Sequence, residues 1–287
     1  MDAARSVVSS LLGDASAAAG AAAALPLLAA AMLATALPTL LALTWGGLTA
    51  PYGKYASGAT AALFGPLVDG RLAWIVQELP SLALPLLLWL RAPPGARPPL
   101  ASQRGVLLAL FVAHYVNRTL VFPLRLRGGK PTPLGVAAMA FAFTLWNGAM
   151  QGLALTLEGG AGDSDGDVLS PRFVLGVCLF VAGAGINLHA DHALRTLRGP
   201  NESGYLIPRG GAFELVSGAN FLGEIVEWSG FALGAWGLPL ARWPALAFAV
   251  FTAANIGPRA LSHHAWLRAK FGAEYPPGRK ALVPFVL

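Results

Sequence analysis

The stretch that decides the fold reads GINLHADHALRTLR at residues 185–198, GPNESGYLIPRGG at 199–211 and AFELVSGANFLGEIVEW at 212–228. It places Asn, Asp, Glu, Arg and His at helical spacing within apolar sequence. Asn187, Asp191 and Arg195 are each four positions apart, so they share one helix face with Arg198. Because ionisable groups are costly inside a bilayer, such a polar stripe in an apolar segment indicates a functional site.

Similar polar groups occur in other apolar segments. They are Gln77-Glu78, then His114, Tyr115 and Arg118, then Asn220 and Glu224, and finally Asn255, Arg259 and His263. One alternative is that polar side chains only hold helices together through hydrogen bonds. That explanation suffices for an isolated Ser217 or Thr252, but it does not explain a set that includes several arginines.

The composition indicates an integral membrane protein. Of the 287 residues, 55% are hydrophobic and 12% are charged, and the mean hydropathy is +0.59. Soluble domains carry about 25% charged residues. The isoelectric point near 9.9 would suit nucleic acid, but the basic residues lie at the ends of apolar runs, where they set topology and contact lipid headgroups. We therefore expect a lipid membrane as a partner and no nucleic acid.

The apolar runs predict an all-α fold with seven transmembrane helices. Each run reaches the roughly 20 residues that a bilayer core requires, and a lone segment in lipid must be helical. The runs cover residues 25–45, 71–91, 105–124, 133–157, 171–197, 211–236 and 243–267. Residues 1–24 form a low-complexity segment, and 25–287 form one membrane domain whose first helix is not a cleaved signal. The distribution of Lys and Arg in the loops predicts an outside N-terminus and a cytosolic C-terminus.

The polar stripes lie mainly in the halves of their helices that face the cytosol. Arginine pairs bidentately with phosphates, and Asn, Asp and Glu bond hydroxyls and amides. The residues thus predict a membrane enzyme that combines a soluble phosphorylated cosubstrate with an apolar partner from the bilayer. The glycines at 183 and 185 lack the strand and third glycine of a dinucleotide fingerprint. The chain has five histidines, fewer than membrane di-iron sites need, so we expect no metal site.

Several longer motifs resemble the steroid 5α-reductase family, in its type 1 and type 2 branch, over roughly residues 50–287. They are PYGKY at 51–55, WIVQELPS at 74–81, HYVNRTLVFP at 114–123, RGGKPTP at 127–133, NGAMQG at 147–152, the stretch at 185–233 and KFGAEYPPGRKALVPFVL at 270–287. The resemblance implies NADPH-dependent reduction of the Δ4 double bond of a 3-oxo-Δ4 steroid that enters from the bilayer.

The resemblance also implies roles for individual residues. Helices 1–4 would form the steroid end, with Gln77, Glu78 and Tyr115 as catalytic residues. Helices 5–7 and the cytosolic loops would form the NADPH end, whose expected residues are Tyr52, Asn187, Asp191, Arg198, Tyr205, Asn220, Glu224, Arg259 and His263. An enone accepts hydride only if its ketone oxygen is stabilised. Tyr115 could donate to that oxygen, and the apolar setting of Glu78 would let it donate as the neutral acid.

The chain departs from the family pattern at two places. Leu267 occupies the position of the tyrosine in the family's His-His-x-Phe/Trp-Tyr motif, and residues 127–131 read RGGKP in place of Asn-Arg-Gly-Arg-Pro. A related enoyl-CoA or polyprenol reductase stays open as an alternative. So does a methyltransferase similar to those of isoprenylcysteine, which would use S-adenosylmethionine, and so does a transporter. We expect a monomeric, multi-pass protein of the bacterial inner membrane or, in a eukaryote, of the endoplasmic reticulum.

Overall fold

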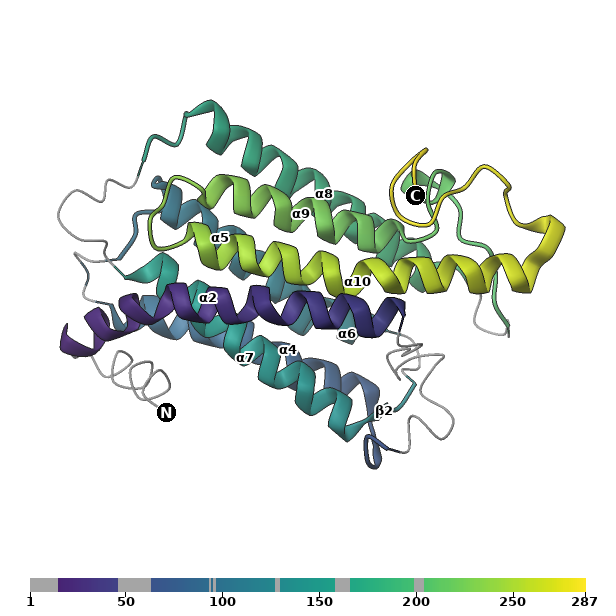
Figure 1. The fold of residues 1–287 in the computed structure, drawn as a ribbon, viewed down its shortest axis with the longest axis horizontal. Coiled ribbons are helices and arrows are strands. Elements are labelled where there is room, and N and C mark those ends of the chain that lie inside the picture. Colours follow the sequence, from purple (N-terminus) through teal and green to yellow (C-terminus); the bar gives the residue numbers. More distant parts are fainter. Residues whose placement is uncertain are drawn as a thin grey trace. The chain divides into compact units, whose positions relative to one another are not determined.

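The computed structural model describes residues 15–45, 63–92, 94, 97–126, 130–157, 166–198 and 204–287. In this part of the chain almost all regular structure is helical, which confirms the all-α part of the predicted fold (Figure 1). The main helices are α2 (Ala15–Thr44), α4 (Gly70–Arg91), α5 (Gln103–Val116), α6 (Phe122–Arg125), α7 (Leu134–Thr156), α8 (Pro171–Thr196), α9 (Ala219–Ala235) and α10 (Arg242–Phe271). Short elements are the π-helical turn η3 (Asn117–Val121), the 3-10 turns η4 (Gly211–Glu214) and η5 (Gly272–Glu274), and the paired strands β1 (Leu67–Val68) and β2 (Thr132–Pro133).

Four helical segments of the described residues are long and apolar enough to cross a membrane. They are Ala19–Thr44, Gly70–Arg91, Gln103–Arg125 and Pro171–Thr196. These four coincide with expected spans, and they support a membrane protein. The other three expected spans overlap α7, α9 and α10, which are helical; α9 has 17 residues, and α7 and α10 carry polar residues within their apolar sequence. The count of seven spans therefore stays a prediction.

One predicted boundary is wrong. The expected span at 211–236 begins as a helix only at Ala219, because residues 211–214 form the separate turn η4. Gly210 and Gly211 have φ angles of 87° and 54°. Glycine adopts this left-handed region without strain, and a right-handed helix cannot continue through it. The glycine pair thus marks the start of η4, and α9 begins only after Val216, Ser217 and Gly218, whose backbone pairs with Lys280 and Ala281 of the C-terminal segment.

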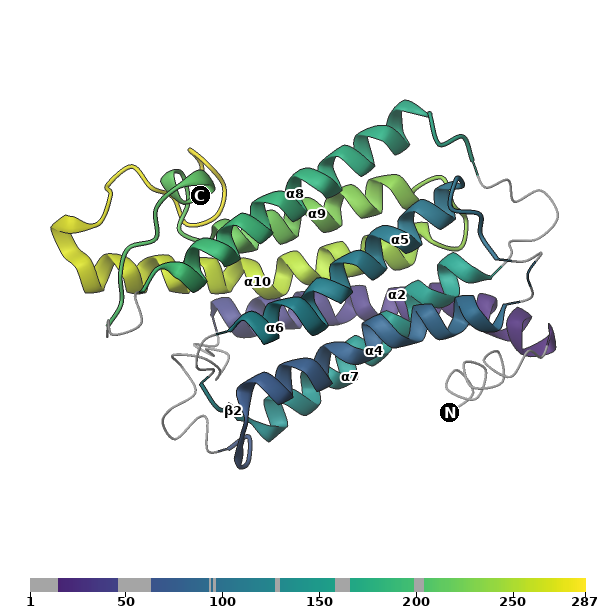
Figure 2. The same cartoon turned by 180° about the vertical axis from the view of Figure 1, so that it is seen from behind.

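The chain divides into two compact units. Unit 1 comprises the described residues of Met1–Met32, Ala50–Val174 and Leu233–Phe248, and unit 2 comprises those of Leu33–Thr49, Leu175–Ala232 and Ala249–Leu287. In unit 1, α4 and α7 lie side by side (Figures 1 and 2). A Cβ atom at Gly148 would lie 2.6 Å from the carbonyl oxygen of Pro80, and one at Gly152 would lie 2.8 Å from Leu88 Cδ1. Glycines in α7 therefore permit its close contact with the proline-containing helix α4.

In unit 2, α8 and α9 approach each other through glycines on both helices. A Cβ atom at Gly223 would lie 2.5 Å from the backbone nitrogen of Asn187, and one at Gly230 would lie 2.6 Å from the carbonyl oxygen of Gly176. Such small-residue contacts are typical of membrane helices, because they let two backbones approach closely. Figures 1 and 2 both show α8 and α9 running alongside each other.

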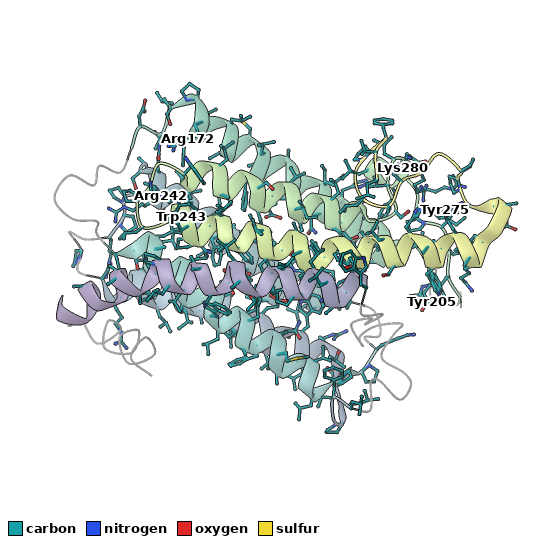
Figure 3. All side chains as sticks on the ribbon, viewed as in Figure 1. Arg172, Tyr205, Arg242, Trp243, Tyr275 and Lys280 are labelled. Carbon is teal, nitrogen blue, oxygen red and sulfur yellow. The ribbon has the colours of Figure 1, made fainter. Side chains whose placement is uncertain are left out.

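The C-terminal segment of unit 2 pairs with the loop before α9. Ser217 N donates to the carbonyl of Lys280 at 2.8 Å, and Gly218 N donates to that of Ala281 at 2.9 Å. Ser217 Oγ lies 2.5 Å from His264 Nδ1 and 2.6 Å from the Tyr275 hydroxyl. We call these three side chains the Ser217 node. Ser217 therefore has the structural role that the sequence predicts for it; Figure 3 labels Tyr275 and Lys280 in this region.

Candidate functional site

The three residues expected at the steroid end all belong to unit 1. Gln77 and Glu78 lie in the middle of α4, and both are half-buried. Tyr115 lies in the last turn of α5 and is 4% exposed. Apolar helices thus supply a carboxyl group, an amide and a phenol to one unit.

A pair of hydroxyl groups fixes the part of α4 that carries Gln77. Pro80 has no N–H, so it interrupts the hydrogen bonds of the preceding turn. There the Thr144 hydroxyl donates to the carbonyl of Gln77, and the Ser81 hydroxyl donates to the carbonyl of Thr144 at 2.9 Å. Helix α7 therefore holds the turn that presents Gln77 and Glu78.

The ring of Tyr115 is enclosed by other rings. Its centroid lies 4.7 Å from that of Phe111 and 5.1 Å from that of His114. Phe111 in turn lies 6.5 Å from Phe248, which closes an aromatic wall within unit 1. Tilted and edge-on pairs of this kind favour a fixed ring position. The phenol is therefore held in place by packing.

Two buried amides on α7 were not assigned a role from the sequence. Asn147 Nδ2 donates to the Tyr115 hydroxyl at 3.2 Å, and Gln151 Nε2 lies 3.3 Å from Asn147 Oδ1. Gln151 Nε2 also donates to the carbonyl of Pro244 at 2.9 Å. Asn147 and Gln151 are both 0% exposed. Their i, i+4 spacing in an apolar run is the signal that singled out the other stripes, and it selects this pair as well.

Arg118 follows Tyr115 in the π-helical turn η3. Its guanidinium lies 4.8 Å from the ring centroid of Trp74 and 5.2 Å from that of Phe122. Trp74 Nε1 donates to the carbonyl of Arg118 at 3.0 Å. π-Helical turns are frequent at functional sites. This turn ties the end of α5 to the start of α4.

Eight of the nine residues expected at the NADPH end belong to unit 2. Tyr52 is the ninth, and it lies outside the described residues, as do the PYGKY motif and residues 127–129. Asn187 and Asp191 on α8 are buried, with exposed fractions of 3% and 8%. Asn187 Nδ2 donates to the carbonyl of Asn220 on α9 at 2.9 Å. The stripes of α8 and α9 therefore meet.

The later part of the polar stripe on α8 turns toward local partners. Arg195 Nη2 lies 3.1 Å from His192 Nδ1, and Arg198 Nη1 donates to the carbonyl of Gly204 at 3.3 Å. On α10, Arg259 Nη2 donates to Asn255 Oδ1 at 2.8 Å, one turn earlier in the same helix. Each of these guanidinium groups thus lies within hydrogen-bond distance of a polar atom of the same helix or the loop that follows it.

An aromatic and basic cluster extends along the later part of α10. The Trp266 ring lies 4.6 Å from the Tyr205 ring and 6.2 Å from the His263 ring, to which it is parallel within 7°. Lys270 Nζ lies 5.6 Å from both the Tyr205 and the Trp266 rings. Leu267, the departure from the family motif, is 2% exposed. The side chain at position 267 is therefore buried, whereas Tyr205, labelled in Figure 3, is exposed.

Comparison with known proteins identifies the family. Residues 130–287 match the family described as 3-oxo-5-alpha-steroid 4-dehydrogenase. The chain is 47% identical over 237 residues to 3-oxo-5-alpha-steroid 4-dehydrogenase 1 of Bos taurus, which covers 83% of this chain and 88% of that protein. It is 45% identical over 235 residues to 3-oxo-5-alpha-steroid 4-dehydrogenase 2 of Homo sapiens, covering 82% and 87%.

The chain belongs to this family. It is therefore an oxidoreductase of the membrane, and the resemblance drawn from its motifs is confirmed. The proteins named 3-oxo-5-alpha-steroid 4-dehydrogenase 1 and 2 align with it to similar extents, so the comparison does not favour one type strongly.

The polar groups of unit 2 are of the kinds that suit a nicotinamide cofactor. Buried Asn187 and Asp191 offer an amide and a carboxylate that suit ribose hydroxyls or a carboxamide. Arg198 and Arg259 offer guanidinium groups that suit phosphates, and Tyr205 offers an exposed ring. In the described part of the chain no group of three His, Cys, Asp or Glu side chains could hold a metal ion.

Proposed function

We propose that this protein reduces the Δ4 double bond of a 3-oxo-Δ4 steroid to the 5α-dihydro steroid, with NADPH as cofactor. The observation that carries this proposal is the 43–47% identity to proteins named 3-oxo-5-alpha-steroid 4-dehydrogenase 1 and 2 over about four-fifths of the chain. The reaction adds a hydride at C5 and a solvent-derived proton at C4. Negative charge develops on the ketone oxygen while the hydride is transferred.

Tyr115 and Glu78 would stabilise that charge as hydrogen-bond donors to the ketone oxygen. The burial and ring packing of Tyr115 support this role, because a donor held in place needs no reorganisation during the reaction. Glu78 is half-buried in α4, and its carboxyl O–H would be the second donor. Gln77, one position earlier on α4, would position Glu78 or the nicotinamide.

NADPH would be held by residues of unit 2 and by Tyr52. When bound, it supplies the hydride that the steroid receives at C5. The proposed binding residues are Tyr52, Asn187, Asp191, Arg198, Tyr205, Asn220, Glu224, Arg259 and His263. Support comes from the meeting of the α8 and α9 stripes at Asn187 and Asn220, and from the guanidinium groups that suit the phosphates.

The proposed membrane arrangement has seven helices, an outside N-terminus and a cytosolic C-terminus. Residues 25–287 would form the reductase domain after a low-complexity segment at 1–24. The steroid would enter from the bilayer, because a steroid partitions into lipid and the helices are apolar. A multi-pass monomer is proposed, in the bacterial inner membrane or the endoplasmic reticulum.

Product analysis tests the reaction. The detergent-purified protein is incubated with NADPH and testosterone or progesterone, and the product is identified by chromatography and mass. A 5α-dihydro product is expected. NADPH binding without steroid turnover would redirect the proposal to an enoyl-CoA or polyprenol substrate. Binding of S-adenosylmethionine without binding of NADPH would contradict it.

A further inference from the structure

A chain of hydrogen bonds connects the Pro244 carbonyl to the Tyr115 hydroxyl. Gln151 Nε2 donates to the carbonyl of Pro244 and to Asn147 Oδ1, and Asn147 Nδ2 donates to the Tyr115 hydroxyl. All four residues lie in unit 1, and the two amides are fully buried. A buried chain of this kind is strongly ordered, because each unmade bond would leave a desolvated polar group.

The carbonyl of Pro244 fixes the orientation of the two side-chain amides. A carbonyl oxygen can only accept, so Gln151 must present its amide nitrogen to Pro244 at 2.9 Å. The same nitrogen lies 3.3 Å from Asn147, which must therefore present Oδ1. Asn147 consequently turns Nδ2 toward Tyr115, and the phenolic oxygen accepts at 3.2 Å. The Tyr115 proton is thus directed to an acceptor other than Asn147.

We propose that Asn147, oriented by Gln151 and the Pro244 carbonyl, is a positioning residue that directs the Tyr115 hydroxyl to the ketone oxygen of the substrate. This inference rests on the proposed function, because it takes Tyr115 as the donor to that oxygen. Asn147 does not touch the substrate in this proposal. Its N–H also stabilises the negative charge that the phenolic oxygen gains as charge builds on the ketone.

A double-mutant cycle between Asn147 and Tyr115 tests the proposal. Turnover is measured at saturating steroid and NADPH for Asn147→Leu, Tyr115→Phe and the double variant. Leucine has the same number of side-chain heavy atoms as asparagine, with the same branch at Cγ, but it donates no hydrogen bond. Asn147→Leu should lower kcat about 10- to 100-fold, because a hydrogen bond to a charge-bearing group is lost. The loss should fall on kcat and not on the steroid KM.

The effect of Asn147→Leu in the Tyr115→Phe background shows whether Asn147 acts through Tyr115. Tyr115→Phe itself should lower kcat about 100- to 1000-fold. In that background Asn147→Leu should not lower kcat further, since no hydroxyl remains to be oriented. An equal loss in both backgrounds, or no loss in either, would overturn the positioning role and leave the proposed function intact. Native turnover by Tyr115→Phe would instead overturn both the positioning role of Asn147 and the proposed role of Tyr115 as donor, and would leave the reaction itself in place.

Two additional variants guard against misfolding. Gln151→Leu removes the amide that orients Asn147, and the same cycle with Tyr115→Phe applies if Asn147→Leu is not stable. Thr156→Val is the matched control, because Thr156 is a buried polar residue of α7 whose hydroxyl donates to Gly152 in its own helix at 2.7 Å. Thr156→Val should retain native turnover. A loss like that of Asn147→Leu in this control would count against the proposal.

Discussion

A single methyl group added to α8 should separate it from α9. In Gly183→Ala the new Cβ would lie 2.2 Å from the backbone nitrogen of Glu227 and 2.6 Å from the carbonyl oxygen of Gly223. Both neighbours are backbone atoms, so neither can rotate away. Ordinary contact begins at 3.4 Å, so the helices must separate locally by about 1.2 Å (3.4 − 2.2). We therefore expect a weaker unit 2.

Gly185→Ala supplies the matched control, two positions further along the same helix. A Cβ at Gly185 meets nothing within 4 Å. Both variants gain the same helix propensity, so their difference isolates the packing cost, which is about 1–3 kcal/mol for overpacking. This corresponds to apparent melting temperatures about 3–10 °C apart.

The assay is thermal melting in detergent, followed by titration with NADPH. Gly183→Ala should melt below Gly185→Ala and bind NADPH more weakly. The second effect is expected because Asn187, one turn beyond Gly183, bonds to α9 at 2.9 Å and would be displaced. Equal melting temperatures for the two variants would refute the close approach of α8 and α9.

Three further predictions concern the site and the tail. Glu78→Gln should lower turnover by orders of magnitude while NADPH still binds, whereas Arg259→Ala should weaken NADPH binding itself. Titration with NADPH and steady-state rates separate the two effects, and native rates for Glu78→Gln would contradict the role of Glu78. Ser217→Ala breaks the buried Ser217 node and should lower the free energy of unfolding by about 1–3 kcal/mol, measured against exposed Ser262→Ala; equal stability of the two would count against the node. Leu267→Tyr should reduce stability by about 1–3 kcal/mol without tightening NADPH binding, because position 267 is 2% exposed; a tighter NADPH complex would show that reasoning to be wrong.

The sequence predicts the helices well because their signal is local. Apolar runs of sufficient length identify α2, α4, α5 and α8 as membrane segments, and these agree with the structure. The start of α9 could not be placed, because the backbone of residues 216–218 pairs with Lys280 and Ala281, a contact across more than 60 positions that no local pattern shows.

The candidate site could be predicted by residue type but not by contact. The spacing of Asn187 and Asn220 indicates stripes, yet the sequence does not show that the Asn187 side chain reaches the Asn220 carbonyl. Asn147 and Gln151 follow the same spacing rule, but the sequence analysis gives them no role, because no ionisable residue accompanies them on α7. Their orientation depends on the carbonyl of Pro244, which is 93 positions beyond Gln151. The spacing of residues in the sequence cannot show that this carbonyl lies next to Gln151.

The pairing of the loop before α9 with the C-terminal segment has a consequence for biogenesis. Lys280 follows its partner Ser217 by 63 positions, with α9 and α10 between them. A ribosome therefore delivers both helices to the insertion machinery before the strand-like partner of residues 215–218 exists. Unit 2 thus reaches its final fold late in synthesis, and a chain arrested between α10 and Lys280 would present inserted helices to quality control with its Ser217 loop unpaired.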